Sequence, residues 1–399
     1  MTKTLANAHA LFCGLKLEAS YLARLDIGDT ARADLMAARA KARAALKLAA
    51  DKIRFEDRYW RDEWHSAARR AMRGPVEVKF MTQGSFAYKT INDPPQWRQE
   101  IDLDDGMYVP VEFLDSGEPA LVAKLLFDFV VETLKPVARA EGWTGVESKP
   151  NCVRVKLWPG AHLDIPIYSV PRERFAQIKE AATASFASAL NRTMMLDSYR
   201  LPSDKIMLAR EDGSWIQSDP QRLQDWVDGR VDQYGPVFRR LCRFFKGWRD
   251  YEWLDCGLSS LCLMRAVDVA LQQYCNEQGA LPGEERDDFL ILEVARRLPD
   301  ILAGEVRNPV LVDACLNSWS DDMRRDIVAR SNQLKDRMIA ALERTGDATE
   351  VVRKLRAIFG ERVPFRPDAV KIAGPQIAAV VHAQPARNPA PAVIASTSG

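Results

Sequence analysis

The sequence predicts an α+β core joined to an α-helical C-terminal domain, and three observations support this fold class. Short runs that alternate apolar and polar residues, as strands do, fall within residues 76–175, around one helical stretch. Residues 1–75 and the chain beyond Arg172 instead show the longer apolar spacing of helices. The chain has 399 residues, enough for two or three domains with cores of their own.

Residues 1–75 predict N-terminal helices, including one long spine. Asp29 and Thr30 can cap its start, and neither proline nor glycine then interrupts the chain before Gly74. Such a helix of about 44 residues would be about 66 Å long, unless it kinks near Asp51. Its apolar stripe is formed by Leu35, Ala38, Ala42, Leu46 and Ala49.

The α+β core is expected over residues 76–190. Its alternating runs predict strands, and a longer stretch that contains Pro136 predicts a helix. The expected order is a strand over 76–80, a strand near 101–109, a helix over 121–141, and strands over 153–157 and 162–170 joined through Pro159 and Gly160.

Residues 191–365 are expected to form the helical domain, with glycine and proline marking the ends of its helices. The Ala/Pro/Val-rich tail, 366–399, is low in complexity, and we expect it to be flexible. One candidate helix, 172–190, ends the α+β core. The candidate helices of the helical domain are 219–231, 235–253, 258–278, 285–298, 320–344 and 347–359.

Composition excludes several classes of protein. Lys plus Arg number 56 and Asp plus Glu 55, a net charge of +1 that argues against a dedicated binder of long nucleic acid. No apolar run reaches the roughly 18 residues of a membrane span, and the N-terminus lacks the pattern of a signal peptide. The seven cysteines are scattered without a CxxC pair, which predicts neither a zinc site nor a disulfide framework. We therefore expect a cytoplasmic protein.

The segment most informative about chemistry combines a glycine-serine turn with two acids. Gly84 and Ser85 follow a predicted strand, and a glycine lets the backbone approach a triphosphate closely. Asp102 and Asp104 lie two apart in a strand, so both carboxylates leave the same face, with Cα atoms about 6.5–7 Å apart. Asp164 supplies a third acid if its strand neighbours theirs. Three carboxylates would suit Mg²⁺ or Mn²⁺, and two such ions can activate a hydroxyl and neutralise a leaving pyrophosphate.

Each of these features also has an ordinary structural interpretation. A DxD pair in a strand is most often a solvated face, a Gly-Ser pair is most often a turn, and Asp164 could be an exposed strand residue. The combination and its order are more specific than any single part, and they favour a nucleotidyl-transfer site.

In these stretches the sequence resembles the bacterial cGAS/DncV-like nucleotidyltransferases (CD-NTases), within the polymerase-beta superfamily. The resemblance runs from about residue 76 to 265 and is looser outside this interval. It implies a mixed sheet with helices, a helical second domain and a bilobal shape with the active site in a central cleft. The matching stretches are Gln83–Tyr88, Glu100–Tyr108, Cys152–Lys156, His162–Pro171, Trp215–Trp226, Cys242–Asp250 and Ser259–Met264.

The resemblance also implies a role for each matching residue. Asp102, Asp104 and Asp164 would hold two Mg²⁺ ions, or Mn²⁺, and Asp164 would assist deprotonation of the attacking hydroxyl. The residues that would line the donor triphosphate site are Gln83, Gly84, Ser85 and Tyr88, in a nucleotide-binding stretch that includes Phe86 and Ala87. The other implied nucleotide contacts are Arg154 and Arg172 in the second half of the pocket, Ser218 and Asp219 at a base edge, and Lys246 and Ser260 at triphosphate oxygens.

Several of these residues have an alternative explanation in the sequence itself. Arg239, Arg243 and Lys246 share one helical face, which suits a polyphosphate but also describes a solvated basic face. Asp219, just before Pro220, can cap the next helix. The aromatic residues that could either stack on bases or pack in the core are Phe86, Tyr88 and Trp215.

The activity that the resemblance implies is synthesis of a cyclic oligonucleotide, with 3′,3′-cyclic GMP–AMP made from ATP and GTP as the favoured product. The product would be a second messenger in CBASS anti-phage defence and would activate a separate effector. Gly399, which ends the small-residue tail, would join a ubiquitin-activating-like conjugation partner, or it is an arbitrary chain end.

Three other functions remain open. The first is a cyclase with another base choice or ring size. The second is a template-independent RNA-extending nucleotidyltransferase of the oligoadenylate synthase type, against which the net charge of +1 counts. The third is a non-enzymatic helical interaction protein with a degenerate site, against which the intact Asp102, Asp104 and Asp164 count.

Overall fold

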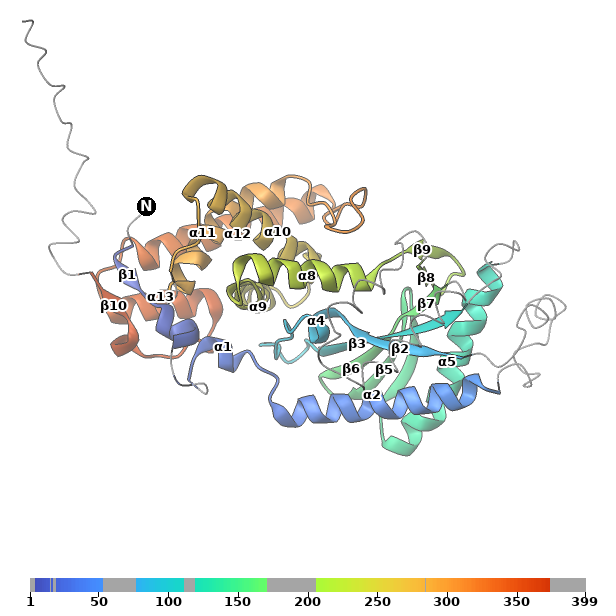
Figure 1. Ribbon diagram of the computed structural model, residues 1–399. Helices are drawn as coiled ribbons and strands as arrows, with labels where there is room; N and C mark the ends of the chain where they lie inside the picture. Colours follow the sequence, from blue (N-terminus) through green and yellow to red (C-terminus); the bar gives the residue numbers. More distant parts are fainter. Residues whose placement is uncertain are drawn as a thin grey trace, which may run out of the picture.

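The structure is a computed structural model, and it describes residues 4–14, 16, 19–52, 77–110, 119–170, 206–283 and 285–373. Two lobes, one built on a sheet and one made of helices, meet in the middle of the molecule (Figure 1). This arrangement confirms the α+β class with a helical C-terminal region. The predicted spine beyond residue 52, the predicted helix over 172–190 and the tail from residue 374 lie outside the described residues.

In the described residues, a mixed sheet of eight strands forms the core of the first lobe. Its central strand, β3 (Ile101–Pro110), pairs antiparallel with β2 (Lys79–Gln83) along one edge. Along the other edge, β3 pairs in parallel with β6 (Ala161–Ile165) and then with β7 (Ile167–Val170). The outer strands are β4 (Gly145–Lys149), β5 (Cys152–Trp158), β8 (Met207–Ala209) and β9 (Trp215–Gln217), in the order β4-β5-β6-β3-β7-β8-β9 with β2 added on β3.

Three features of the sheet differ from the expectations drawn from the sequence. The predicted strand over 162–170 is two strands, because Pro166 has no N–H for the ladder and separates β6 from β7. β2 begins at Lys79, three residues after the predicted start at Val76. The strands β4, β8 and β9 are not predicted, since they are short and lack a clear apolar alternation.

Helices α2 (Asp29–Ala50) and α5 (Pro119–Glu141) pack on each other and cover one face of this sheet (Figure 1). α2 ends at Ala50, next to the position where the sequence allows a kink at Asp51. The predicted apolar stripe is buried against the sheet, with Ala50 more deeply buried than Ala49. The buried residues of α2 are Leu35, Ala38, Ala42, Leu46 and Ala50.

Within the described part of the chain beyond residue 205, six α-helices form the second lobe, and each lies within a few residues of a predicted one. The largest difference is at the end of α11. The predicted helix ends at residue 298, just before Pro299, whereas α11 continues past this proline to Ala303. The six are α8 (Pro220–Tyr234), α9 (Val237–Glu252), α10 (Ser260–Gln278), α11 (Asp287–Ala303), α12 (Asp321–Leu342) and α13 (Ala348–Phe359).

The first described residues, from residue 4 on, pack on the helical lobe before α2 crosses to the sheet (Figure 1). β1 (Ala6–Asn7) pairs antiparallel with β10 (Lys371–Ile372). The rings of Phe12 and Tyr21 lie 5.4 Å and 5.8 Å from the ring of Phe244 on α9. Segments near both ends of the described chain therefore share one hydrophobic core with the helices.

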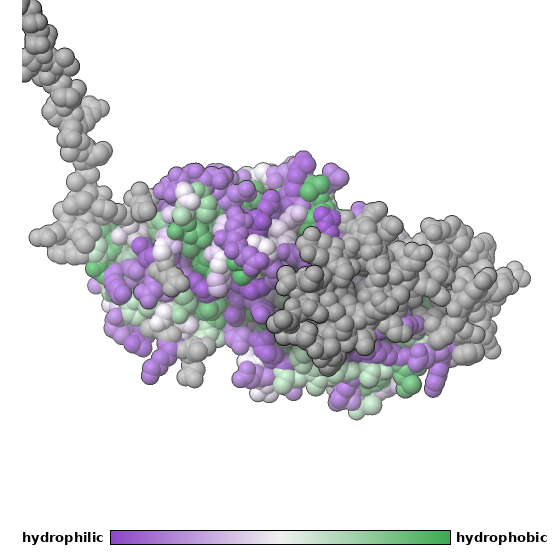
Figure 2. Space-filling model, viewed as in Figure 1, coloured by the Kyte–Doolittle hydropathy of each residue, from purple (hydrophilic) through white to green (hydrophobic). Residues whose placement is uncertain are grey.

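Hydrophilic side chains are prominent on the visible surface of the helical lobe. On the face shown in Figure 2, they alternate there with smaller groups of apolar side chains. Among the described helices, none combines the length and the hydropathy that crossing a membrane requires. All seven cysteines are free thiols, as their scattered positions predict.

Candidate active site

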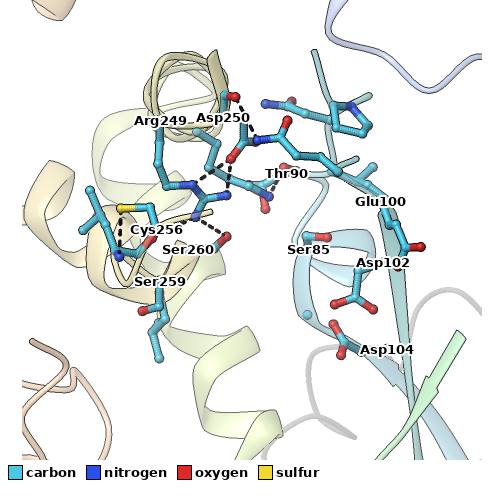
Figure 3. A pocket seen from close by; sticks show the side chains of 18 of the residues that line it. Ser85, Thr90, Glu100, Asp102, Asp104, Arg249, Asp250, Cys256, Ser259 and Ser260 are labelled. Carbon is cyan, nitrogen blue, oxygen red and sulfur yellow. Dashed lines mark hydrogen bonds and ion pairs between the residues drawn. The ribbon is translucent and has the colours of Figure 1, made fainter. Parts of the chain in front are cut away.

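An open cavity of about 640 Å³ lies between the two lobes. The sheet lobe contributes α4 (Gly84–Ala87) and strands β3, β5 and β6, and the helical lobe contributes α9, the turn after it and the start of α10. Figure 3 shows these walls facing each other, with Asp102 and Asp104 on one side and Arg249 and Ser260 on the other. The volume lies in the range of small-molecule sites, about 300–1,000 Å³.

The two acids of the DxD pair reach the cavity from β3, where alternate residues share a face. β3 and β6 pair in parallel, and in that register Asp104 lies opposite Asp164 while Asp102 lies opposite His162. One ligand atom from each of Asp102, His162 and Asp164 falls within 4.8 Å of the others. The strand of the third acid is thus a neighbour of β3, and Asp102 and Asp164 both lie near enough to Asp104 for their charges to act on it. Of the three acids, Asp102 and Asp104 are among the described residues that line the cavity, and Asp164 is not.

Negative charge is concentrated around Asp104. Its burial, and then the charges of Asp102 and Asp164, raise the pKa of the Asp104 carboxyl well above its usual range. Arg154 offsets part of this charge by donating two hydrogen bonds to Asp164, from Nε at 2.8 Å and from Nη2 at 2.7 Å. A divalent cation bound beside these carboxylates would compensate their negative charge and favour the ionised form of Asp104.

Gly84 brings the backbone of the loop against Asp104. Its φ of +65° lies in the left-handed region that favours glycine. A Cβ at this position would lie 1.9 Å from Oδ2 of Asp104, a distance that leaves no room for a side chain. The glycine therefore permits this close approach, and it places the following residue, Ser85, at the cavity wall (Figure 3).

The rest of this loop divides between the cavity and the cores. Gln83 donates from Nε2 to the hydroxyl of Tyr168 at 2.8 Å, and it is not among the described residues that line the cavity. Tyr88 is buried and lines the cavity. The residues that pack against the hydrophobic cores are Phe86, Ala87 and Trp215, which favours the core interpretation for these aromatic rings.

The basic row of α9, which consists of Arg239, Arg243 and Lys246, is not a solvated face. These side chains donate hydrogen bonds that hold the segment over 88–92 against the helical lobe. Of its three members, Lys246 also lines the cavity, where burial, and then the charge of Arg249, lower its pKa to about 8. The fastening bonds run from Arg239 Nε to the Tyr88 carbonyl (3.1 Å), from Arg243 Nε to Asn92 Oδ1 (2.9 Å) and from Lys246 Nζ to the Thr90 carbonyl (2.9 Å).

Arg249 extends the helical wall of the cavity by nearly one turn beyond Lys246. Its Nη1 donates to Oγ of Ser260 at 3.0 Å and to the carbonyl of Leu258 at 3.1 Å. Ser259 caps α10, so the start of this helix lies at the cavity wall. Sequence reasoning did not single out Arg249, although its spacing of three residues from Lys246 places it on the same face.

Two further predicted nucleotide contacts, Ser218 and Asp219, are not found among the described residues at this cavity. Asp219 caps α8 by accepting a hydrogen bond from the N–H of Arg222 at 2.9 Å, as its structural interpretation predicts. Arg172 lies outside the described residues.

Two further residues of the site, Glu100 and His162, were missed by sequence reasoning. Both line the cavity beside Asp102. The available signal was the spacing of His162 and Asp164, which are two apart on one strand and so share its face. Finding it required knowing that β6 lies next to β3.

Replacing Arg243 by Ala should lower the free energy of unfolding by about 1–3 kcal/mol. The side chain is 15% exposed, and the change removes its bond to Asn92 and its 3.8 Å ion pair with Asp26. Thermal unfolding followed by circular dichroism measures the effect. Arg325→Ala is the control, because that side chain is 71% exposed on α12. An unchanged midpoint for Arg243→Ala would contradict the fastening role of the basic row.

Comparison with family models places two matches on the chain. The model described as "Cyclic GMP-AMP synthase DncV-like, nucleotidyltransferase domain" matches residues 78–168. The model described as "Cyclic GMP-AMP synthase, C-terminal domain" matches residues 235–370. The first match contains the loop and all three acids, and the second contains the helical wall of the cavity.

Individual proteins give the same result. The chain is 32% identical over 338 residues to a cyclic GMP-AMP synthase of Escherichia coli strain TW11681, covering 81% of this chain and 76% of that protein. The structure resembles Vibrio cholerae DncV cyclic AMP-GMP synthase in complex with the linear intermediate 5′ pppA(3′,5′)pG, with a TM-score of 0.76 and 25% identity over 93% of this chain and 100% of that one. A mutant of this Vibrio cholerae di-nucleotide cyclase in complex with ATP, GTP and 5MTHFGLU2 gives a TM-score of 0.74 and 25% identity at the same coverage.

Proposed function

The chain belongs to the family of DncV-like cyclic GMP-AMP synthases, and we propose that it joins ATP and GTP by nucleotidyl transfer into 3′,3′-cyclic GMP–AMP. The observation that carries this proposal is the group of three acids, Asp102, Asp104 and Asp164, on two paired strands, with Asp104 against Gly84 and the first two acids lining a cavity between the lobes. The Vibrio cholerae relatives that hold ATP and GTP, or the linear intermediate, support the choice of substrates.

We propose Mg²⁺, or Mn²⁺, as the cofactor, bound by the carboxylates of Asp102, Asp104 and Asp164. The residues fit such a cation, because the donors are hard carboxylate oxygens and Oδ1 of Asp102 is buried with only the Nε2 atom of His162 nearby, at 3.1 Å, among the described residues. The charges that raise the pKa of Asp104 are those that a cation would offset. When bound, the cation makes a hydroxyl more acidic and neutralises the charge on leaving pyrophosphate.

The reaction consists of two similar transfers. In each, a ribose hydroxyl oxygen forms a bond to an α-phosphorus, the bond from that phosphorus to the bridging oxygen breaks, and pyrophosphate leaves. Gly84 and Ser85 hold the donor triphosphate from the sheet side, and Lys246 and Ser260 hold it from the helical side. The hydroxyl must lose its proton as it attacks. Asp164 belongs to the acidic cluster beside the reacting groups, and we assign it the role of accepting this proton.

Incubation of the full chain with radiolabelled ATP, GTP and Mg²⁺ tests this function. The expected product is small and keeps its label after phosphatase treatment, because a ring has no terminal phosphate. The same reaction is run with added RNA. A ladder of extended RNA would favour the template-independent alternative, and the absence of any product would contradict nucleotidyl transfer.

Replacing Lys246 by Met should weaken binding of a nonhydrolysable nucleoside triphosphate about 10- to 100-fold, the effect of one charged hydrogen bond. Because the pKa of Lys246 is lowered to about 8, its positive charge is lost as the pH rises through that value. The affinity of the wild type should therefore fall above about pH 8, whereas that of Lys246→Met should change less. Titrations across this pH range measure both, with Lys135→Met as an exposed control. Parallel pH profiles for the wild type and Lys246→Met would contradict the role of Lys246.

We also propose that the cyclic product acts as a second messenger that activates a separate effector during phage infection. Family membership supports this proposal. The conjugation predicted for Gly399 concerns a residue outside the described ranges and stays a prediction.

A further inference from the structure

Asp102 has a neighbour that the proposed reaction leaves unused. His162 is 5% exposed, and its Nε2 lies 3.1 Å from Oδ1 of Asp102 and 3.8 Å from Oδ2 of Asp164. On the other side of the ring, Nδ1 lies at hydrogen-bond distance, 2.8 Å, from Oε2 of Glu100. The ring thus lies between the carboxylate of Glu100 and the carboxylates of the DxD cluster.

The sheet itself builds this arrangement. His162 on β6 and Asp102 on β3 are partners in the parallel ladder, so their side chains leave the sheet side by side. Glu100 directly precedes β3 and lies two residues before Asp102, and all three side chains line the cavity. The backbone register therefore fixes the positions of His162 and Asp102, and Glu100 directly precedes the paired segment.

The carboxylates at the two ends of this series of contacts are more exposed to solvent than the ring between them. The side chain of Asp102 is 42% exposed and that of Glu100 39%, whereas that of His162 is 6% exposed. A half-exposed carboxylate can adopt several rotamers, and ordering it costs free energy when it binds a cation. A buried ring that is itself held from behind restricts that freedom, as residues behind metal ligands generally do.

We infer that His162 is a positioning residue: its ring, with an N–H on each nitrogen, donates from Nε2 to the Asp102 carboxylate that would bind the cation and from Nδ1 to Glu100, which orients the ring. This inference rests on the proposed nucleotidyl-transfer site, because it assigns Asp102 as a cation ligand. Glu100 affects Asp102 only indirectly, by holding the ring of His162. Neither Glu100 nor His162 needs to touch a nucleotide for this role.

Binding of Mn²⁺ to the full-length protein, followed by electron paramagnetic resonance, tests the inference without any turnover. His162→Ala should raise the Mn²⁺ dissociation constant about 10- to 100-fold, and Glu100→Gln should raise it by a smaller factor. The double variant should bind no more weakly than His162→Ala alone, because Glu100 acts only through the ring. The control is Glu147→Gln on β4, which pairs with Lys149 and Lys156 and lies outside the cavity lining.

Product formation gives a second readout. In His162→Ala, the Mg²⁺ concentration for half-maximal rate should rise by a factor similar to that seen with Mn²⁺, and KM for ATP at saturating Mg²⁺ should change little. His162→Gln, which keeps an N–H at a similar reach, should recover part of the lost affinity. If His162→Ala does not fold, as judged by thermal unfolding, Glu100→Gln carries the test because its side chain is partly exposed.

Folded His162→Ala and Glu100→Gln proteins that bind Mn²⁺ as the wild type does would overturn the inference. A wild type that binds no Mn²⁺ would overturn it together with the proposed metal site. If the wild type makes no nucleotide product but binds Mn²⁺ in a manner that depends on His162, the proposed function fails and the inference stands.

Discussion

Replacing Asp104 by Asn is expected to reduce product formation at least about 10³-fold. Asp104 is under the influence of the charges of Asp102 and Asp164, and it lies opposite Asp164 in the ladder and against the loop at Gly84. An amide keeps the shape of the side chain but supplies no negative charge for a cation. The measurement is the steady-state rate of cyclic product formation from ATP and GTP with Mg²⁺.

The same variant should not be less stable than the wild type without divalent cations. The pKa of Asp104 is raised in the folded protein, so its ionised form is disfavoured there and destabilises the fold at neutral pH. Asn removes that charge, and we expect an equal or higher unfolding midpoint in EDTA. The activity control is Asp212→Asn, at an exposed turn between β8 and β9. Full activity of Asp104→Asn would refute the proposed role of the cluster.

Replacing Gly84 by Ala is expected to reduce product formation about 10²- to 10³-fold. The added Cβ would lie 1.9 Å from Oδ2 and 2.8 Å from Cγ of Asp104, so the loop or the carboxylate must move. A displacement of about 1 Å at a catalytic group is enough for a loss of this size. The rate of product formation measures the effect.

Gly142→Ala is a matched control for this change. Gly142 has a φ of +70°, close to the +65° of Gly84, but a Cβ there would meet nothing within 4 Å. Both variants therefore carry a similar backbone strain, of about 1–2 kcal/mol, and only Gly84→Ala meets the carboxylate. Equal activity losses in the two variants would show that strain alone, and not contact with Asp104, explains the effect.

The parts of the site that follow from local periodicity could be predicted from the sequence. Asp102 and Asp104 face one side of a strand because alternate residues of a strand always do. Asp219 caps a helix because an Asp before a proline suits that position. The helices of the second lobe were predicted because their apolar spacing, with glycine or proline at several ends, is long and regular.

The parts that depend on distant contacts could not be predicted. The residue pattern alone did not indicate that β6 pairs with β3, and without this pairing neither Asp164 nor His162 is known to reach the cluster. The sequence predicted that Arg239, Arg243 and Lys246 share one helical face, but the spacing of residues on a helix does not indicate which groups they contact. Those partners belong to the segment over 88–92, about 150 residues earlier in the chain. Tertiary contacts of this kind follow from packing and not from local propensity.

Mass spectrometry of the product made by the full chain from all four nucleoside triphosphates and Mg²⁺, with pyrophosphate counted in the same reaction, tests the central claim most directly. Two transfers between ATP and GTP predict one dominant mass, that of cyclic GMP–AMP, and two pyrophosphates for each molecule of product. Asp104→Asn should give neither. A wild-type reaction that yields only linear oligomers, or a product that Asp104→Asn forms equally well, would contradict the assignment of this cavity as the site of cyclic dinucleotide synthesis.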